Sequence, residues 1–214
     1  MIVRTLSVCL LFVGIQLSAA VSANEWIEKQ NERGILIQQQ PTASGYAITR
    51  GTREIATTLP VLVNVLRDAG VCKELIFSCK SGAVVETYNK NERLDYVVID
   101  APLLLDDRDI YVHSSSSYDR ATKTVLIRLS GREKHDAGQP GKVRVRGMSG
   151  FWRFQQMTPD KAQVTYQVYS DPQIPGGSFF SSVLAESVFF TLENLAKLVR
   201  SPKYQTTETI ESMM

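Results

Sequence analysis

The chain has 214 residues, a formal net charge of +2 and 21% charged residues, which fits one globular domain with a sizeable core. A near-neutral balance without a block of lysine and arginine argues against nucleic acid as the partner. The basic stretch at 142–146 alternates charged and apolar residues, as one face of a strand does. The alternative, a patch that binds phosphate or a membrane surface, stays open.

Residues 1–23 have the pattern of a signal peptide. Arg4 gives a positive start, residues 6–17 are largely apolar, and small residues lead up to Ala23, after which we expect cleavage. The apolar run is too short to span a bilayer comfortably. We therefore expect a periplasmic or secreted protein, with a folded domain over 24–205 and a disordered tail over 206–214 that lacks periodicity.

The mature chain begins with alternating helix and strand patterns. An amphipathic stretch before Gly34 predicts a short helix over 24–33. Two strands and two helices are predicted next, over 35–40, 46–55, 58–70 and 71–80.

Beyond Gly82 the pattern changes to strands joined by short polar turns, which indicates antiparallel hairpins. Six strands are expected, over 83–89, 92–100, 108–118, 122–132, 141–156 and 161–169. A long helix is predicted over 177–199, because apolar residues recur there at steps of three or four. This order predicts an α+β fold in which a helix crosses one curved antiparallel sheet.

Two cysteines, Cys72 and Cys79, remain after signal cleavage. An oxidising compartment favours a disulfide between them. Seven residues of helix would separate them by about 10 Å, beyond the limit of about 7 Å between the Cα atoms of a disulfide. The bond is therefore possible only where the predicted helix is broken between the two residues.

Five motifs follow one another in order over almost the whole mature chain: LDYVVIDAP at 94–102, DRDIYV at 107–112, VTY at 164–166, DPQIP at 171–175 and TLENL at 191–195. Their collinear order resembles the StAR-related lipid transfer (START) family, in an exported bacterial form. One departure is the glycine pair, which follows Pro175 here instead of the Asp-Pro of the family pattern.

The resemblance implies a helix-grip fold, in which a curved antiparallel sheet wraps around the long C-terminal helix and leaves an internal apolar cavity. It also implies a carrier or sensor of one lipid or other hydrophobic molecule, with no cofactor or metal and transient contact with a membrane. Each buried CH₂ of such a ligand is worth about 0.8 kcal/mol, so the cavity must be dry and apolar. We expect a monomer, because no strong surface heptad is visible.

The candidate ligand-binding residues alternate along strands or lie on the final helix. They are Val98, Arg108, Trp152, Phe154, Tyr166, Phe179, Val183 and Phe190. The apolar members are equally compatible with ordinary core, because core and cavity share a face in this architecture. The guanidinium of Arg108 is compatible with a ligand head group or with a structural ion pair that fixes the turn after Pro102.

Two other functions remain open. An enzyme on the same scaffold, similar to polyketide cyclases, would need an acid or base in the cavity, for which His113, Asp100 and Tyr166 are the candidates. We expect no enzyme, since no nucleophile motif or metal-ligand spacing is present. An envelope interaction module would instead have an interior filled by Phe179, Phe180 and Phe190.

Overall fold

The computed structural model describes residues 25–101, 106–132, 139–173 and 177–214 of the chain. The predicted signal peptide, 1–23, lies outside these residues. The described strands form one ten-stranded sheet in the order β1-β2-β3-β10-β9-β7-β6-β5-β4, and β8 pairs with β6. All pairs are antiparallel except β6 with β8. The strands are β1 (Ile27–Glu32), β2 (Ile35–Gln40), β3 (Ile48–Ala56), β4 (Cys79–Asn89), β5 (Glu92–Ile99), β6 (Asp107–Asp119), β7 (Thr124–Arg132), β8 (Lys142–Arg144), β9 (Arg146–Thr158) and β10 (Lys161–Asp171).

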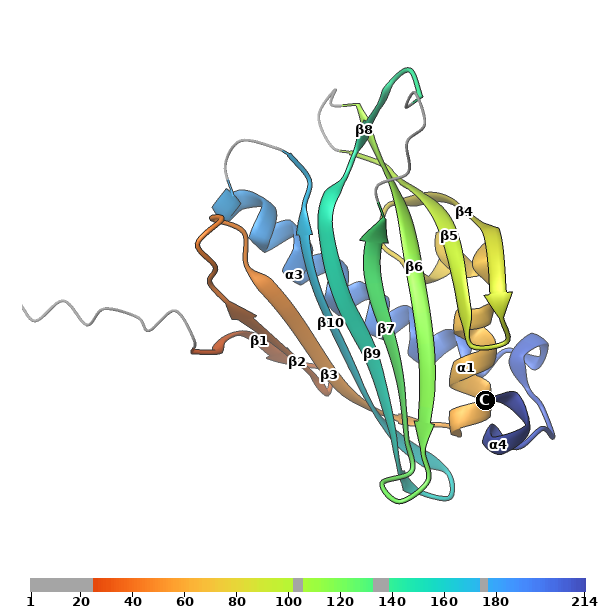
Figure 1. Ribbon diagram of the computed structural model, residues 1–214. Helices are drawn as coiled ribbons and strands as arrows, with labels where there is room; N and C mark the ends of the chain where they lie inside the picture. The colour runs from red at the N-terminus through yellow and green to blue at the C-terminus, as the bar shows by residue number, and fades with distance from the viewer. Residues whose placement is uncertain (1–24, 102–105, 133–138, 174–176) are drawn as a thin grey trace, which may run out of the picture.

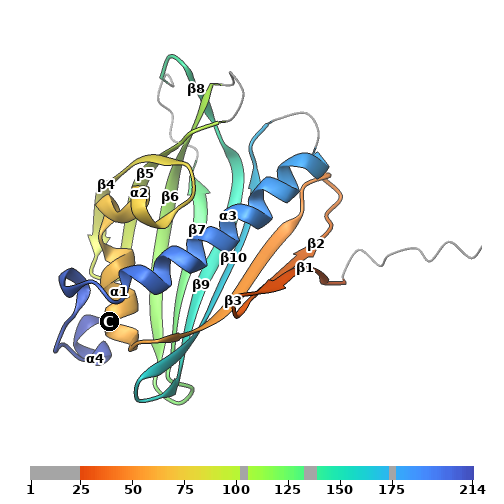
Figure 2. The same cartoon turned by 180° about the vertical axis from the view of Figure 1, so that it is seen from behind.

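The helices gather on one side of this curved, open sheet, which we call the inner face (Figures 1 and 2). They are α1 (Leu59–Arg67), the 3-10 helix η1 (Ala69–Val71), α2 (Cys72–Leu75), α3 (Gly177–Leu198), the 3-10 helix η2 (Pro202–Tyr204) and α4 (Ile210–Met213). Figure 2 shows α3 crossing the inner face diagonally, with α1 and α2 beside its C-terminal end. The predicted α+β helix-grip arrangement is confirmed. Within the described residues, no helix is both long and apolar enough to cross a membrane.

The second half of α3 packs closely against the sheet. Val188, Leu192 and Leu195 are at most 1% exposed. A Cβ atom at Gly51 of β3 would lie 2.6 Å from Leu192 Cδ1 and 2.7 Å from Val188 Cγ1. A glycine at this position therefore lets the helix approach the sheet, and the apolar stripe predicted for α3 forms part of the core.

The helix predicted over 24–33 is wrong, because this segment is the edge strand β1. Residues 27–32 pair with β2 through a tight turn, in which Arg33 and Gly34 have φ of 53° and 70°. Ladder hydrogen bonds to β2 satisfy the backbone here, and they override a weak helical periodicity over so short a segment. The strand expected over 141–156 is likewise divided into β8 and β9.

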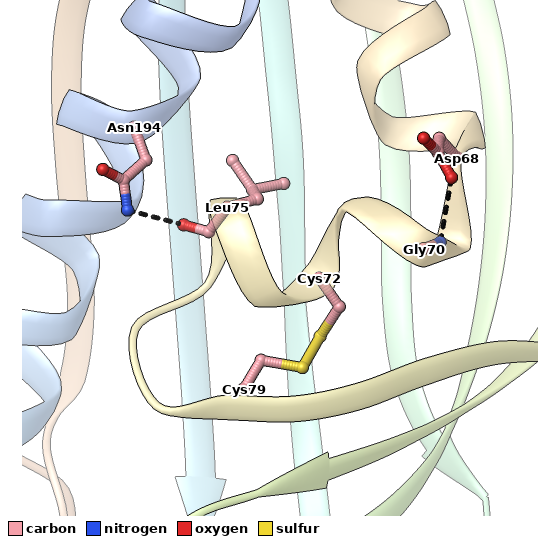
Figure 3. The surroundings of a disulfide bond; sticks show 6 residues. All are labelled: Asp68, Gly70, Cys72, Leu75, Cys79 and Asn194. Atoms are coloured by element: carbon pink, nitrogen blue, oxygen red, sulfur yellow. Dashed lines mark hydrogen bonds between the residues drawn. A yellow bond between two sulfur atoms is a disulfide. The ribbon is translucent and has the colours of Figure 1, made fainter.

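The second predicted helix, over 71–80, is also too long. It ends at Leu75, and the chain turns through Ser78, whose φ is 61°, into β4 at Cys79. The turn brings the Cα atoms of Cys72 and Cys79 to 5.8 Å, and the two residues form a disulfide (Figure 3). The geometric objection to this bond disappears because the helix does end between the two cysteines.

The tail over 206–214, which we expected to be disordered, ends in the short helix α4. Thr209 accepts a hydrogen bond from the backbone N–H of Ser212 at the start of this helix. Ile210 and Met213 are 6% and 2% exposed and belong to the core cluster. Two apolar residues three apart are too few to define a period, so only their packing against the rest of the domain reveals the helix.

Candidate ligand-binding site

A pocket of about 460 Å³ lies on the inner face, between the segment α1–η1–α2 and the strands β4 and β5. Its volume falls within the range of roughly 300–1,000 Å³ that is usual for small-molecule sites. Helix and strand side chains make the apolar part of its wall, among them Val63, Leu66, Val71, Leu75, Ile76 and Val97. Two of these residues, Val63 and Leu66, belong to α1, an amphipathic helix that buries its apolar side.

The wall on the side of β4 is held by a close contact and by the disulfide. Cys72 and Gly82 both line the pocket. A Cβ atom at Gly82 would lie 2.7 Å from the carbonyl oxygen of Ala69, so η1 sits almost directly on β4. Asp68 accepts a hydrogen bond from the N–H of Gly70 at 2.9 Å, and Asn194 of α3 donates to the carbonyl of Leu75 at 3.4 Å (Figure 3). The disulfide fixes α2 to the edge strand β4, and the two hydrogen bonds hold the η1 turn and join α2 to α3.

A charged pair on β5 supplies the polar end of the pocket. Arg93 Nε donates to Asp95 Oδ2 at 2.9 Å, and Arg93 Nη2 donates to the carbonyl of Leu66 at 2.8 Å. Asp95 Oδ1 and Asn91 Oδ1 are buried, and neither has a hydrogen-bond partner among the described residues. Two residues of the pocket wall, Asn91 and Asp95, therefore each have an acceptor oxygen whose hydrogen-bonding capacity the described residues leave unused.

The environment of Asp95 changes the pKa of its carboxyl group. Burial raises the pKa of this carboxyl group, and the charge and hydrogen bond of Arg93 only partly oppose that rise. A buried acceptor without a partner costs about 1–3 kcal/mol, which a ligand with a hydroxyl or amino donor would recover. The arrangement can therefore hold the polar end of a largely apolar molecule.

Sequence inspection missed Arg93 and Asp95. The detectable signal was the alternation over 93–97, which places Arg93, Asp95 and Val97 on one face of β5 and Leu94 and Tyr96 on the other. Two charged residues beside Val97 on a pocket-facing side are unusual for a strand of the core. Without the fold, however, nothing indicated which of the two faces was covered.

Three of the predicted residues share the inner face of the central strands. Trp152 lines the pocket and stacks on Tyr166, with ring centroids 4.0 Å apart and planes 9° apart. Burial raises the pKa of the Tyr166 hydroxyl to about 12. Phe154 follows Trp152 on the same face and is fully buried in the core cluster. The structure therefore places Trp152 at the pocket and Phe154 in the core beyond it.

The three candidates on α3 do not line this pocket. Phe179 is 61% exposed near the start of the helix, and Val183 is half-buried. Phe190 is also half-buried and stacks on Phe77, with centroids 5.5 Å apart. Phe77 precedes β4, so this ring pair joins α3 to the turn that the disulfide closes.

The two candidates on β5 and β6 also lie away from the pocket. Val98 pairs with Asp109 and lies on the opposite side of β5 from Val97, because successive strand residues point to opposite faces. Arg108 is 7% exposed, and its Nε donates to the carbonyl of Pro172 at 3.2 Å. It also donates to the carbonyl of Asp106. Its hydrogen bonds to described residues go to backbone carbonyls instead of a carboxylate, and they hold the start of β6 against the end of β10.

The three residues considered for catalysis are not gathered in one place. His113 lies on the outer face of the sheet, where its Nε2 is 2.7 Å from Glu92 Oε1. Asp100 is exposed and forms an ion pair with Lys80 at 2.8 Å. Tyr166 lies on the inner face beside Trp152. Within the described residues, no cluster of three His, Cys, Asp or Glu side chains could hold a metal ion.

Comparison with solved structures shows the fold clearly. A StAR-related lipid transfer protein from Xanthomonas axonopodis superposes with a TM-score of 0.75 at 22% identity, over 82% of this chain and 99% of that chain. The human StAR-related lipid transfer protein 5 gives a TM-score of 0.71 at 14% identity, over 85% and 88% of the two chains. At these identities the likeness establishes the fold, and the resemblance to START domains predicted from the sequence is confirmed at that level.

Sequence comparison adds little about function. The chain is 27% identical over 187 residues to an uncharacterized protein of Pseudomonas aeruginosa, covering 84% of this chain and 87% of that protein. No protein-family model matches the chain. The function therefore has to be argued from the fold and from the pocket.

Proposed function

We propose that this protein binds one lipid or another hydrophobic molecule on the inner face of its sheet, as a periplasmic carrier or sensor. The observation that carries the proposal is the pocket of about 460 Å³, whose largely apolar wall includes Asp95, a residue with one carboxylate oxygen that has no partner among the described residues. The apolar wall takes the hydrocarbon part of the ligand. Asp95 accepts a hydrogen bond from a hydroxyl or amino group at its polar end.

The fold supports this proposal. The structural neighbours with high TM-scores are named as lipid transfer proteins. Burial of hydrocarbon is worth about 0.8 kcal/mol for each CH₂, which a carrier must match to compete with a bilayer. The pocket between the helices and the curved sheet favours such burial, because both surfaces present apolar side chains to it.

The proposed location rests on the export signal and agrees with the disulfide. Disulfides persist in oxidising compartments such as the bacterial periplasm, and Cys72–Cys79 links two parts of the pocket wall. We propose a monomer that touches a membrane transiently. The exposed Phe179 provides one apolar contact for this step. Cell fractionation followed by N-terminal sequencing checks the location, with Asn24 as the expected first residue.

The decisive experiment asks what the purified protein carries. Organic extraction and mass spectrometry should identify a co-purifying hydrophobic molecule with a hydroxyl or amino group. The purified protein should also take up a fluorescent analogue of that molecule. The proposal is refuted if no lipid co-purifies and the protein also takes up no labelled lipid from a diverse panel.

A pair of variants tests the polar end of the pocket. Asp95→Asn keeps the shape of the side chain but replaces one acceptor oxygen with an amide donor, so uptake should weaken by about tenfold. Asp100→Asn is the matched control, because Asp100 follows the same strand but its side chain is 55% exposed. Equal uptake by the two variants would show that Asp95 does not contact the ligand.

A further inference from the structure

The outer face of the central strands is open. Figure 1 views the sheet from this side, with β6, β7 and β9 in front and α3 behind them. A hollow of about 690 Å³ lies on this face, lined by residues of these three strands. It is separated from the lipid pocket by the thickness of the sheet.

Three arginines line this hollow and point out of the sheet. Arg128 and Arg132 come from β7, and Arg153 comes from β9. All three are exposed, and none forms an ion pair with a carboxylate of the described residues. The hydrogen bond of Arg153 Nη2 to Gln155 Oε1, at 2.6 Å, adds no charge compensation.

Strand register brings two of these arginines together. Arg128 is paired with Ser115 on one side and with Phe151 on the other. Arg153 lies two residues beyond Phe151, which makes it a diagonal neighbour of Arg128 at roughly 7–8 Å between Cα atoms. The two guanidinium groups can therefore reach one anionic group, beside the hydroxyl of Ser115.

The third arginine forms a second subsite along β7. Arg132 is four residues from Arg128, or about 13 Å along the strand. Between them Ser130 is paired with His113 on β6 and with Ser149 on β9. The row of two hydroxyl groups and an imidazole provides further hydrogen-bonding groups between the two arginine subsites.

Folding does not explain this concentration of positive charge. Like charges at neighbouring positions of a sheet destabilise it, and the carboxylate of Glu92, which contacts His113 at the hollow, forms no ion pair with these arginines. Guanidinium groups bind phosphate oxygens through paired N–H donors, and serine hydroxyls add further donors. An anion with several phosphate oxygens would offset the repulsion.

We propose that the groove formed by Arg128, Arg132, Arg153, Ser115 and Ser130 is a second binding site, for a ligand that carries at least two phosphate groups. One phosphate contacts Arg128 and Arg153, and another contacts Arg132. The ligand is therefore a polyphosphate or a molecule with several phosphate esters. Such groups occur on soluble molecules and on anionic lipid head groups, and the experiment below separates these sources.

The test is isothermal titration calorimetry of the full mature chain with sodium tripolyphosphate at low ionic strength. The double variant Arg128→Gln/Arg153→Gln should bind about a hundredfold more weakly, because two charged hydrogen bonds are lost and each is worth roughly tenfold. Arg200→Gln is the matched control, since Arg200 is an exposed arginine just beyond α3. Its affinity should equal that of the wild type, and added salt should weaken binding to both.

Sedimentation with vesicles distinguishes the two sources of phosphate. Binding to vesicles that contain cardiolipin, whose head group carries two phosphates, but not to phosphatidylcholine vesicles or tripolyphosphate, assigns the groove to a lipid head group if the double variant loses it. The proposal is overturned if neither probe binds, or if the double variant and Arg200→Gln bind alike. Uptake of labelled lipid by the inner pocket should be unchanged in the double variant, so the two sites can fail independently.

Discussion

The inner and outer faces of the same strands have opposite chemistry. On β7 and β9, Val125 and Phe154 point inward and are fully buried, whereas Arg128 and Arg153 point outward and are exposed. Helices cover the first face and leave the second open (Figures 1 and 2). The difference shows how one sheet can present an apolar pocket and a basic groove without either site disturbing the other, since alternate residues serve the two faces.

The largest expected difference between the inner and outer faces is in the effect of substitutions on the free energy of unfolding. Phe154→Ala removes a fully buried ring and should lower the free energy of unfolding by about 3–5 kcal/mol in urea denaturation. Phe151→Ala, three residues earlier and half-buried on the outer face, is the matched control and should cost clearly less. Equal losses would contradict the assignment of the two faces.

Removing the disulfide tests whether it holds α2, which covers part of the inner face, against the edge strand β4. Replacing both Cys72 and Cys79 with serine frees a loop with a sequence separation of 7 and should cost about 2 kcal/mol of unfolding free energy. Reductant should destabilise the wild type by a similar amount and leave the double variant unchanged. A variant that is as stable as the oxidised wild type would show that the bond does not constrain this wall.

The pocket should also have a distinctive pH dependence. Because the pKa of Asp95 is raised in the folded protein, the folded state retains a proton that the unfolded state has lost above the ordinary value of about 4. Stability contributed by this group is therefore lost as pH rises through the folded pKa. Compared with Asp95→Asn, the wild type should lose unfolding free energy between about pH 4 and that pKa, an effect smaller than the two above.

The contribution of Asp68 to the unfolding free energy should depend on pH in the opposite direction to that of Asp95. Its hydrogen bond with Lys203 lowers the pKa of the carboxyl group, so its contribution is present above the ordinary value and is lost as pH falls through the folded pKa. Compared with Asp68→Asn, the wild type should lose unfolding free energy on acidification. Parallel pH profiles for the two pairs would contradict the environment assigned to Asp95.

The smallest effect is expected on the outer face. The stability of Arg128→Gln/Arg153→Gln should lie within about 0.5 kcal/mol of the wild type, because both side chains are exposed and neither forms an ion pair with a described residue. A small stabilisation would fit relief of like-charge repulsion. A loss above about 2 kcal/mol, measured by the same urea denaturation, would mean that these arginines support the fold.

The sequence predictions are most accurate for long segments, where the periodic pattern repeats several times. The long helix α3 and the antiparallel strands β4, β5, β6, β7, β9 and β10 have enough repeats for their period to be read, and they are present in the structure. Strand β1 and helix α4 are too short for that, and each depends on contacts with segments distant in the sequence. The break at Leu75 likewise follows from the approach of η1 and α2 to β4.

The sequence by itself determined which residues share a face: Trp152 with Phe154, Arg93 with Asp95, and Arg128 with Arg132. Only the tertiary structure decided which of those faces the helices cover, and so which residues line a pocket and which meet solvent. The physical reason is that strand alternation is a local property of the backbone, whereas burial depends on the path of α1, α2 and α3 across the sheet. On β5, the predicted residue Val98 lies on the face away from the pocket, whereas Asp95, which was not predicted, lines the pocket. The local pattern could not show which of these two faces the helices cover.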